Sequence, residues 1–251
     1  MGQYQRTIRH YLLLVGLQVA LTGWGCATTP PYTKNPFIIS KEEFKTRITT
    51  VVLEPLTVPD GLKDQEQVVA QFESLMTKKL VEAGFSVLNP QQVTEISQWS
   101  REQVGGVFDP VTGKRDESRF ATARKLCLEE LRTKYHADAV VCPSIQIAKA
   151  KFQNCWAKWD GVEEEISPVY FGVFCGSGNV FGSVPALSLV VRIENMDGRW
   201  IYLNGGGIQV LSRIKTAFIA QSLTDVDRAL LFANRERNQT AVNIALGPLL
   251  P

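Results

Sequence analysis

The chain has 251 residues, of which 45% are hydrophobic and 21% are charged, as is typical of a protein that builds a core. Its 27 basic and 25 acidic residues give a net charge of +2, and Arg6 and Arg9 account for that excess. The neutral remainder excludes a nucleic-acid-binding protein, because phosphate binding requires clustered Lys and Arg. His136 is the one histidine after residue 25, so a His-rich metal site is excluded as well.

Residues 1–25 have the layout of a secretion signal. A short basic stretch is followed by an apolar run, YLLLVGLQVAL, and then by small residues. The apolar run is shorter than the roughly 20 residues that a membrane-spanning helix needs. The segment therefore predicts export from the cytoplasm.

The residues after this run, Gly25-Cys26-Ala27, resemble the end of a bacterial lipoprotein signal. The resemblance implies that Cys26 becomes the N-terminus and is acylated with chains such as palmitate. Gly23 and Trp24 depart from the pattern, which prefers Leu and a small residue at these places. Two alternatives stay open: ordinary signal peptidase cuts after Gly25 or Ala27, or the segment remains as an uncut anchor.

Residues 26–47 are expected to form a flexible tether between lipid and domain. The stretch ATTPPYTKNP has three prolines in ten residues and few core-forming side chains. By resemblance to lipoprotein sorting in Gram-negative bacteria, Ala27 in place of Asp implies the periplasmic face of the outer membrane. The periplasmic domain is then expected over residues 48–251.

The rest of the chain alternates strand and helix patterns. Segments typical of strands are residues 49–56, 85–88, 138–147 and 186–195. Segments typical of helices are residues 64–83, a helix beginning at Asn89-Pro90, residues 120–135, and a helix from Thr224 to Gly247-Pro248. Residues 105–118 are expected to be an exposed loop, and 152–185 an irregular stretch. Asp197-Gly198 predicts a β-hairpin. The order predicts an α/β fold with a mixed sheet and helices packed on it.

Four segments in this order resemble the periplasmic domain of the curli-secretion-channel family and its relatives, the lipoprotein activators of peptidoglycan synthases. The segments are VVLEPL, EAGFSVL, HADAVVCPSI and LVVRIENMDGRWIYLNGGG. The resemblance covers about residues 48–250 and implies an outer-membrane lipoprotein. It carries over one functional residue, the acylation site Cys26.

Four cysteines remain after Cys26, and the oxidising periplasm allows three complete pairings of them. A Cys155–Cys175 bridge would close a loop of about 20 residues and contribute roughly 3 kcal/mol. Cys127 and Cys142 are expected to be buried as small hydrophobic residues, with a bridge between them as the alternative.

No catalytic, metal or cofactor motif is found in the sequence. The chain has no C-x-x-C, and His136 has no helical partner for a metal. A thiol enzyme would need Cys175 activated by His136, which nothing in the sequence brings together. The glycines of 176–182 are spaced wrongly for a dinucleotide loop, and Gly205-Gly206-Gly207 predicts a bulge or bend in a sheet. We therefore expect a protein that is not an enzyme and has no cofactor.

The stretch from Phe152 to Phe181 is rich in aromatic residues and glycines, and two interpretations stay open. Either its aromatics complete the core of an elaborated hairpin, or they form a surface for a partner or membrane. In the channel family, inserted hairpins build an oligomeric barrel. Glu163-Glu164-Glu165 is expected to be a solvated turn. The candidate surface residues are Trp156, Trp159, Tyr170, Phe171 and Phe174.

The sequence thus predicts a lipoprotein that acts as a binding or assembly factor in the cell envelope. Its expected partners are the outer membrane, through the lipid anchor, and an envelope protein or further copies of itself. The alternatives are a subunit of an oligomeric secretion pore and a periplasmic hydrolase that acts through carboxylates.

Overall fold

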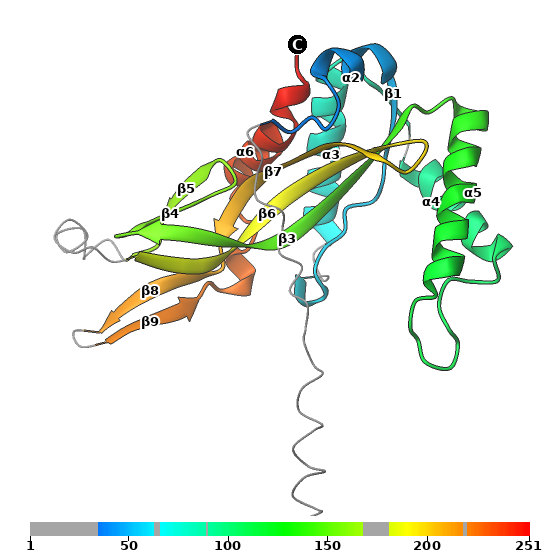
Figure 1. Cartoon of the computed structure of the whole chain (residues 1–251). Helices are drawn as coiled ribbons and strands as arrows, with labels where there is room; N and C mark the ends of the chain where they lie inside the picture. The colour runs from blue at the N-terminus through cyan, green and yellow to red at the C-terminus, as the bar shows by residue number, and fades with distance from the viewer. Residues whose placement is uncertain (1–34, 63–65, 89, 168–180, 218–219) are drawn as a thin grey trace, which may run out of the picture. The chain divides into compact units, whose positions relative to one another are not determined.

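Two long antiparallel strands form the centre of the fold (Figure 1). Strands β3 (Ala139–Gln153) and β6 (Phe181–Asn195) pair over their full length, from Ala139 opposite Asn195 to Gln153 opposite Phe181. The computed structural model describes residues 35–62, 66–88, 90–167, 181–217 and 220–251. These residues belong to one compact unit, Tyr32–Pro251.

The other strands extend this pair into a mixed sheet of seven strands. Strand β1 (Thr50–Leu53) lies parallel to the first part of β3, and β2 (Ser86–Leu88) lies parallel to β1 at the edge. Strands β4 (Trp156–Trp159) and β5 (Val162–Glu165) follow the last part of β3. Strand β7 (Trp200–Val210) pairs with β6, and β8 (Ser212–Ala217) pairs with β9 (Ala220–Asp225) in a second sheet.

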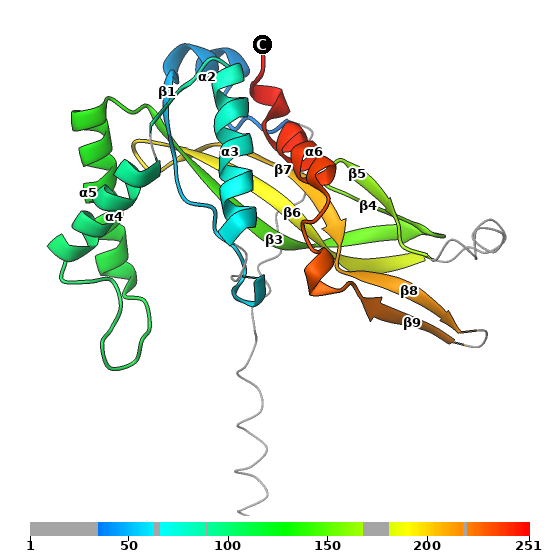
Figure 2. The same ribbon diagram turned by 180° about the vertical axis from the view of Figure 1, so that it is seen from behind.

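Helices cover both faces of the sheet beside β1 (Figures 1 and 2). The α-helices are α2 (Lys41–Arg47), α3 (Glu66–Glu82), α4 (Pro90–Gln103), α5 (Glu117–Tyr135) and α6 (Arg235–Leu246). Short 3₁₀ helices are η1 (Asp60–Leu62), η3 (Arg228–Leu230) and η4 (Gly247–Leu249). The predicted α/β fold with a mixed sheet and helices packed on it is confirmed.

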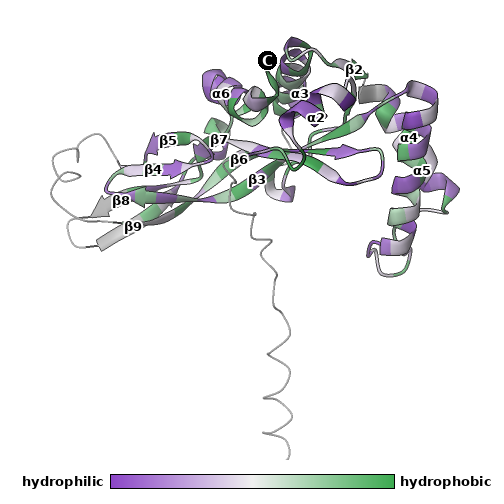
Figure 3. Ribbon diagram, turned by 45° about the horizontal axis from the view of Figure 1, so that its top comes forward, coloured by the Kyte–Doolittle hydropathy of each residue, from purple (hydrophilic) through white to green (hydrophobic). Residues whose placement is uncertain are grey.

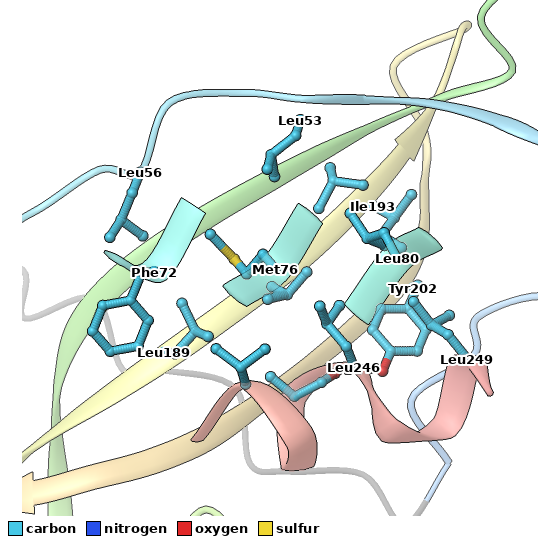
Figure 4. Packing of buried hydrophobic residues seen from close by; sticks show 14 of the residues in the cluster. Leu53, Leu56, Phe72, Met76, Leu80, Leu189, Ile193, Tyr202, Leu246 and Leu249 are labelled. Atoms are coloured by element: carbon cyan, nitrogen blue, oxygen red, sulfur yellow. Dashed lines mark hydrogen bonds between the residues drawn. The ribbon is translucent and has the colours of Figure 1, made fainter. Parts of the chain in front are cut away.

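The main core lies between the sheet and helices α2, α3 and α6 (Figure 4). Helix α3 buries Phe72, Met76 and Leu80 at a spacing of four residues, which places them on one side of the helix. Tyr202 of β7 is fully buried here, and its hydroxyl donates to the Ala245 carbonyl of α6 at 2.6 Å. That bond satisfies a polar group that would otherwise be costly to bury.

Helices α4 and α5 pack on the opposite face of the same end of the sheet. Val93 of α4 and Leu131 of α5 join Val140 of β3 in this second core. In Figure 3, hydrophilic and hydrophobic residues alternate along these helices, as expected when one side of a helix is buried. Helix α5 ends at His136 in the left-handed conformation, with φ of 52°, close to its predicted end.

The folded domain begins before residue 48, so the predicted tether of residues 26–47 extends too far. Phe37 lies in the main core and pairs with Tyr202 as an isolated bridge. Helix α2 starts after Ser40, whose hydroxyl accepts a hydrogen bond from the Glu43 amide at 3.0 Å, and it buries Phe44. Two aromatic side chains therefore attach this segment to the core.

Two predicted segments differ from the structure. The stretch expected to be irregular, residues 152–185, contains the end of β3, all of β4 and β5, and the start of β6, while residues 168–180 lie outside the described residues. The helix expected from Thr224 begins at Arg235, because β9 continues to Asp225 and Asn234 provides the N-cap. The Asn234 side chain accepts a hydrogen bond from the Arg237 amide at 3.1 Å.

Candidate partner surface

The sheet continues beyond the helices as a part that we call the arm. The arm comprises residues 147–167 and 181–187, which are the last part of β3, the β4–β5 hairpin and the first part of β6. In Figures 1 and 2 these strands extend away from α3, α4 and α5. The arm contains every described residue of the predicted partner surface.

The buried face of strand β3 changes from its odd-numbered to its even-numbered residues where the arm begins. Odd-numbered residues from Ala139 to Ile145 are buried under α3 and α6, but Ile147 is 57% exposed. Beyond it, Ala150 on the even face is fully buried in a separate core with Ala157, Val184 and other residues. Successive side chains of a strand point to opposite faces, so the exposed face of the arm continues the face that helices cover elsewhere.

A tight turn brings the β4–β5 hairpin back to β7. Asp160 and Gly161 have positive φ of 39° and 78°, which suits the two-residue turns of hairpins. The Asp160 carbonyl accepts from the Gly207 amide at 2.9 Å, and the Trp159 indole N–H donates to the Leu187 carbonyl at 3.1 Å. The arm is therefore closed on one face by its own hairpin.

Two consecutive glycines of β7 allow this closure. A Cβ on Gly206 would lie 2.1 Å from the Ala241 carbonyl oxygen of α6, and one on Gly207 would lie 2.1 Å from Val162. Helix α6 and the hairpin thus approach β7 from opposite faces. The pairing of β6 with β7 shifts register between Leu187 and Ser188, which face Gln209 and Gly207, so a bulge lies directly after the three glycines where a bulge or bend was predicted.

Glu164 joins the hairpin to three other elements. Its buried carboxylate accepts from the Val210 amide at 3.0 Å and from Arg213 Nη2 at 2.9 Å, and it forms an ion pair with Arg237 at 2.7 Å. The prediction of a solvated turn at Glu163–Glu165 is therefore wrong. This segment belongs to β5, and of its three glutamates Glu163 is exposed, beside Lys158, Glu164 is buried and Glu165 is partly buried.

Asp160 is the other acidic group of the hairpin that the fold encloses. Burial raises the pKa of its carboxyl, and the hydrogen bond from the Ser188 hydroxyl opposes that shift without cancelling it. Within the residues that the structure describes, this carboxyl group has a hydrogen bond from a neutral hydroxyl and no ion pair, so burial dominates its pKa.

The exposed face of the arm presents a row of three residues across three strands, and the two outer residues are aromatic. Phe181 of β6 pairs with Gln153 of β3, and Gln153 pairs with Trp156 of β4. Directly paired residues of antiparallel strands share a face, so the three side chains lie side by side. Phe181 is 79% exposed and Trp156 is 48% exposed. We call Phe181, Gln153 and Trp156 the aromatic row.

The structure separates the predicted surface residues. Trp156 is exposed as predicted, but Trp159 is 7% exposed and belongs to the core of the arm, so its assignment to a partner surface is wrong. The physical reason is the two-residue period of β4, which sends Trp156 and Trp159 to opposite faces. Tyr170, Phe171 and Phe174 lie outside the described residues.

The cysteines divide into two kinds. Cys155 is buried and disulfide-bonded, while its predicted partner Cys175 lies outside the described residues, as does Cys26. The alternative bridge between Cys127 and Cys142 is wrong, because both are free thiols. Burial raises the pKa of both thiols, which keeps them protonated and poorly nucleophilic.

The sequence carries a local signal for the β4–β5 hairpin. Trp156-Ala157-Lys158-Trp159 contains two aromatic residues, which favour strands, and runs directly into Asp160-Gly161, a strong hairpin-turn pair. No comparable signal marks Glu164, because its partners Val210, Arg213 and Arg237 come from distant parts of the chain.

Two further properties hold for the part of the chain that the structure describes. Its helices include none with both the length and the apolar composition that crossing a membrane requires. Its His, Cys, Asp and Glu side chains form no group of three that could hold a metal ion.

Comparisons with known proteins give little. No family model and no curated protein matches the chain. Among solved structures, the chain is similar to a variant of the PelC dodecamer from Paraburkholderia phytofirmans, with 10% identity and a TM-score of 0.34 over 82% of this chain and 91% of that chain. A second PelC dodecamer from the same organism has 9% identity and a TM-score of 0.33, covering 81% and 88%. Values this low carry no argument about function.

Proposed function

We propose that this protein is a lipoprotein of the bacterial outer membrane that binds a protein partner in the periplasm through the arm. The observation that carries this proposal is the aromatic row, in which Phe181 is 79% and Trp156 is 48% exposed on the face opposite the core of the arm. Aromatic residues are enriched at protein interfaces, where they bury a large area with few rotatable bonds.

Charges beside the row support a protein partner. Lys151 lies opposite Lys158 in the sheet, and Lys158 lies opposite Glu163. Two basic side chains are therefore followed by an acidic one across the same face. Exposed aromatic side chains flanked by polar and charged groups are a common composition of an interface. The Glu164 contacts and the hairpin closure hold this face in place without using any of its side chains.

The sequence that precedes the folded domain supports the proposed location. The basic and apolar signal, Cys26 and the proline-rich stretch after it match the order found in lipoproteins. Acyl chains on Cys26 would hold the protein on the membrane through burial of their methylene groups. In this proposal the protein is not an enzyme, and its action is to hold or assemble a complex.

Fractionation of the envelope tests the anchor. A Cys26→Ala variant is expected to move from the membrane fraction to the soluble periplasmic fraction, with Cys127→Ala as the control that stays with the membrane. A Cys26→Ala variant that remains in the membrane fraction would contradict lipid anchoring.

Photo-crosslinking tests the partner surface. A crosslinking amino acid at position 181 or 156 is expected to capture a discrete protein in intact cells, while one at exposed Phe108 on the α4–α5 loop is not. Capture at Phe108 alone would place the interface elsewhere. Capture of a second copy of this chain, together with ring-sized assemblies in detergent, would favour the oligomeric pore subunit.

A further inference from the structure

A cavity of about 810 Å³ lies on the side of the sheet that α4 and α5 cover, and none of its lining residues belongs to the arm. Its walls come from the end of β1, from α4, from α5 and from β6, four elements that are distant in the chain. This volume is within the range of small-molecule sites. The cavity is independent of the aromatic row and of the proposed function.

The floor of the cavity is a fixed network of charges. Arg124 of α5 donates to Glu54 at the end of β1 and, at 2.8 Å, to Glu194 of β6. Burial alone would lower the pKa of Arg124, but the Glu54 and Glu194 carboxylates raise it well above its usual value. Arg124 is thus permanently charged, and both carboxylates already have a cation.

Two more guanidinium groups line the cavity. Arg192 of β6 lies over the Trp200 ring at 4.9 Å, and its Nε is 2.9 Å from Glu194 without the geometry of a hydrogen bond. Arg101 of α4 forms no ion pair with any residue that the structure describes. Three arginines against two glutamates leave the cavity with one positive charge in excess.

The remaining wall suits hydroxyl groups and a flat ring. Thr57 and Ser97 contribute hydroxyls, and Gln98 contributes an amide. The Phe120 ring also lines the cavity, with the Arg115 guanidinium 4.4 Å from its centroid. Hydroxyls and amides act as both donors and acceptors, which a ligand rich in hydroxyl groups can use.

We propose that this cavity binds a small carboxylate that also carries hydroxyl groups, such as a uronic acid sugar. Arg101 and Arg192 would pair with the carboxylate, since guanidinium groups bind carboxylates in a forked geometry. Thr57, Ser97 and Gln98 would bind the hydroxyl groups, and Phe120 would pack against the ring. Arg124 positions the wall and does not contact the ligand.

Titration calorimetry with D-glucuronate tests this inference on the purified full-length protein. Saturable binding at one site is expected, with much weaker binding of D-glucose, which has the hydroxyls without the carboxylate, and of acetate, which has the carboxylate alone. The absence of saturable glucuronate binding, or equal affinity for glucose or acetate, would overturn the inference.

Matched variants locate the site. Arg101→Gln and Arg192→Gln are each expected to weaken glucuronate binding about tenfold, the usual cost of one charged hydrogen bond. Arg119→Gln is the control, because Arg119 is an exposed residue of α5 that pairs with Asp116 outside the cavity. Circular dichroism checks that each variant is folded. Equal weakening by all three variants, or by none, would place the binding elsewhere.

Discussion

The two ends of the β3–β6 pair use the same strands in opposite ways. At the helical end, residues from Ala139 to Ile145 bury their odd-numbered side chains under α3 and α6. In the arm, that face is open to solvent and holds the aromatic row, while the even face is covered by the hairpin. One long strand can therefore build a core at one end and present a surface at the other, because a second element closes the opposite face.

Trp159 and Trp156 give the sharpest test of this comparison, and the largest expected effect. Trp159→Ala is expected to lower the free energy of unfolding by about 3–5 kcal/mol, because it empties the core of the arm and removes the bond to Leu187. Trp156→Ala is expected to change it by less than about 1 kcal/mol. Urea unfolding followed by circular dichroism measures both. Similar losses for the two variants would contradict the exchange of faces.

Gly206 tests the approach of α6 to β7. Gly206→Ala places a Cβ within 2.1 Å of the Ala241 carbonyl, so either the helix or the strand must move. We expect a loss of about 3 kcal/mol in the free energy of unfolding. Gly61→Ala is the control, because its nearest atom would be 3.9 Å away. A Gly206→Ala variant as stable as the control would show that the helix does not pack against this glycine.

Glu164 tests whether the arm is fixed by a buried carboxylate. Glu164→Ala leaves the Val210 amide and two arginines without their acceptor and is expected to cost about 2 kcal/mol in thermal or urea unfolding. Glu163→Ala removes an exposed pair with Lys158 and is expected to cost less than about 0.5 kcal/mol. A reversed order of these two losses would contradict the role assigned to Glu164.

Asp160 gives the smallest effect and a definite dependence on pH. Burial raises its pKa in the folded state above the unfolded value near 3.9, so the folded state binds the proton more tightly. The stability this contributes is complete below the unfolded pKa and is lost as pH rises through the folded pKa. Asp160→Asn keeps the turn and the acceptor for Ser188, and it should therefore be more stable than wild type at neutral pH, with a difference that shrinks toward pH 4. A difference that grows on acidification would refute this sign.

The sequence predicted those elements whose pattern is local. Helix α3 followed from the spacing of Phe72, Met76 and Leu80, and the β6–β7 hairpin followed from Asp197-Gly198. Strand β3 extends beyond its predicted end at residue 147, because a strand that exchanges its buried face has no single alternating pattern. The start of α6 at Arg235 was missed because Thr224 belongs to β9, which pairs with β8.

The candidate site was predictable only in part. The composition of the stretch indicates Trp156 as a surface residue, but composition cannot distinguish Trp156 from Trp159. That distinction requires the register of β4. Phe181 joins the row because β6 pairs with the far end of β3 across an intervening segment. The cavity over Arg124 depends on Glu54 and Glu194, whose distance in sequence from that arginine leaves no local pattern.

The central claim is that the aromatic row is used for binding and not for folding. The most direct test is the mass of the full-length protein, extracted from membranes in mild detergent, compared with a Trp156→Ser/Phe181→Ser double variant. We predict that the wild type runs as a discrete complex and that the double variant, folded and still anchored, runs at the mass of the monomer. A complex of unchanged mass in the double variant, or its loss in a Phe108→Ser control, would contradict the claim.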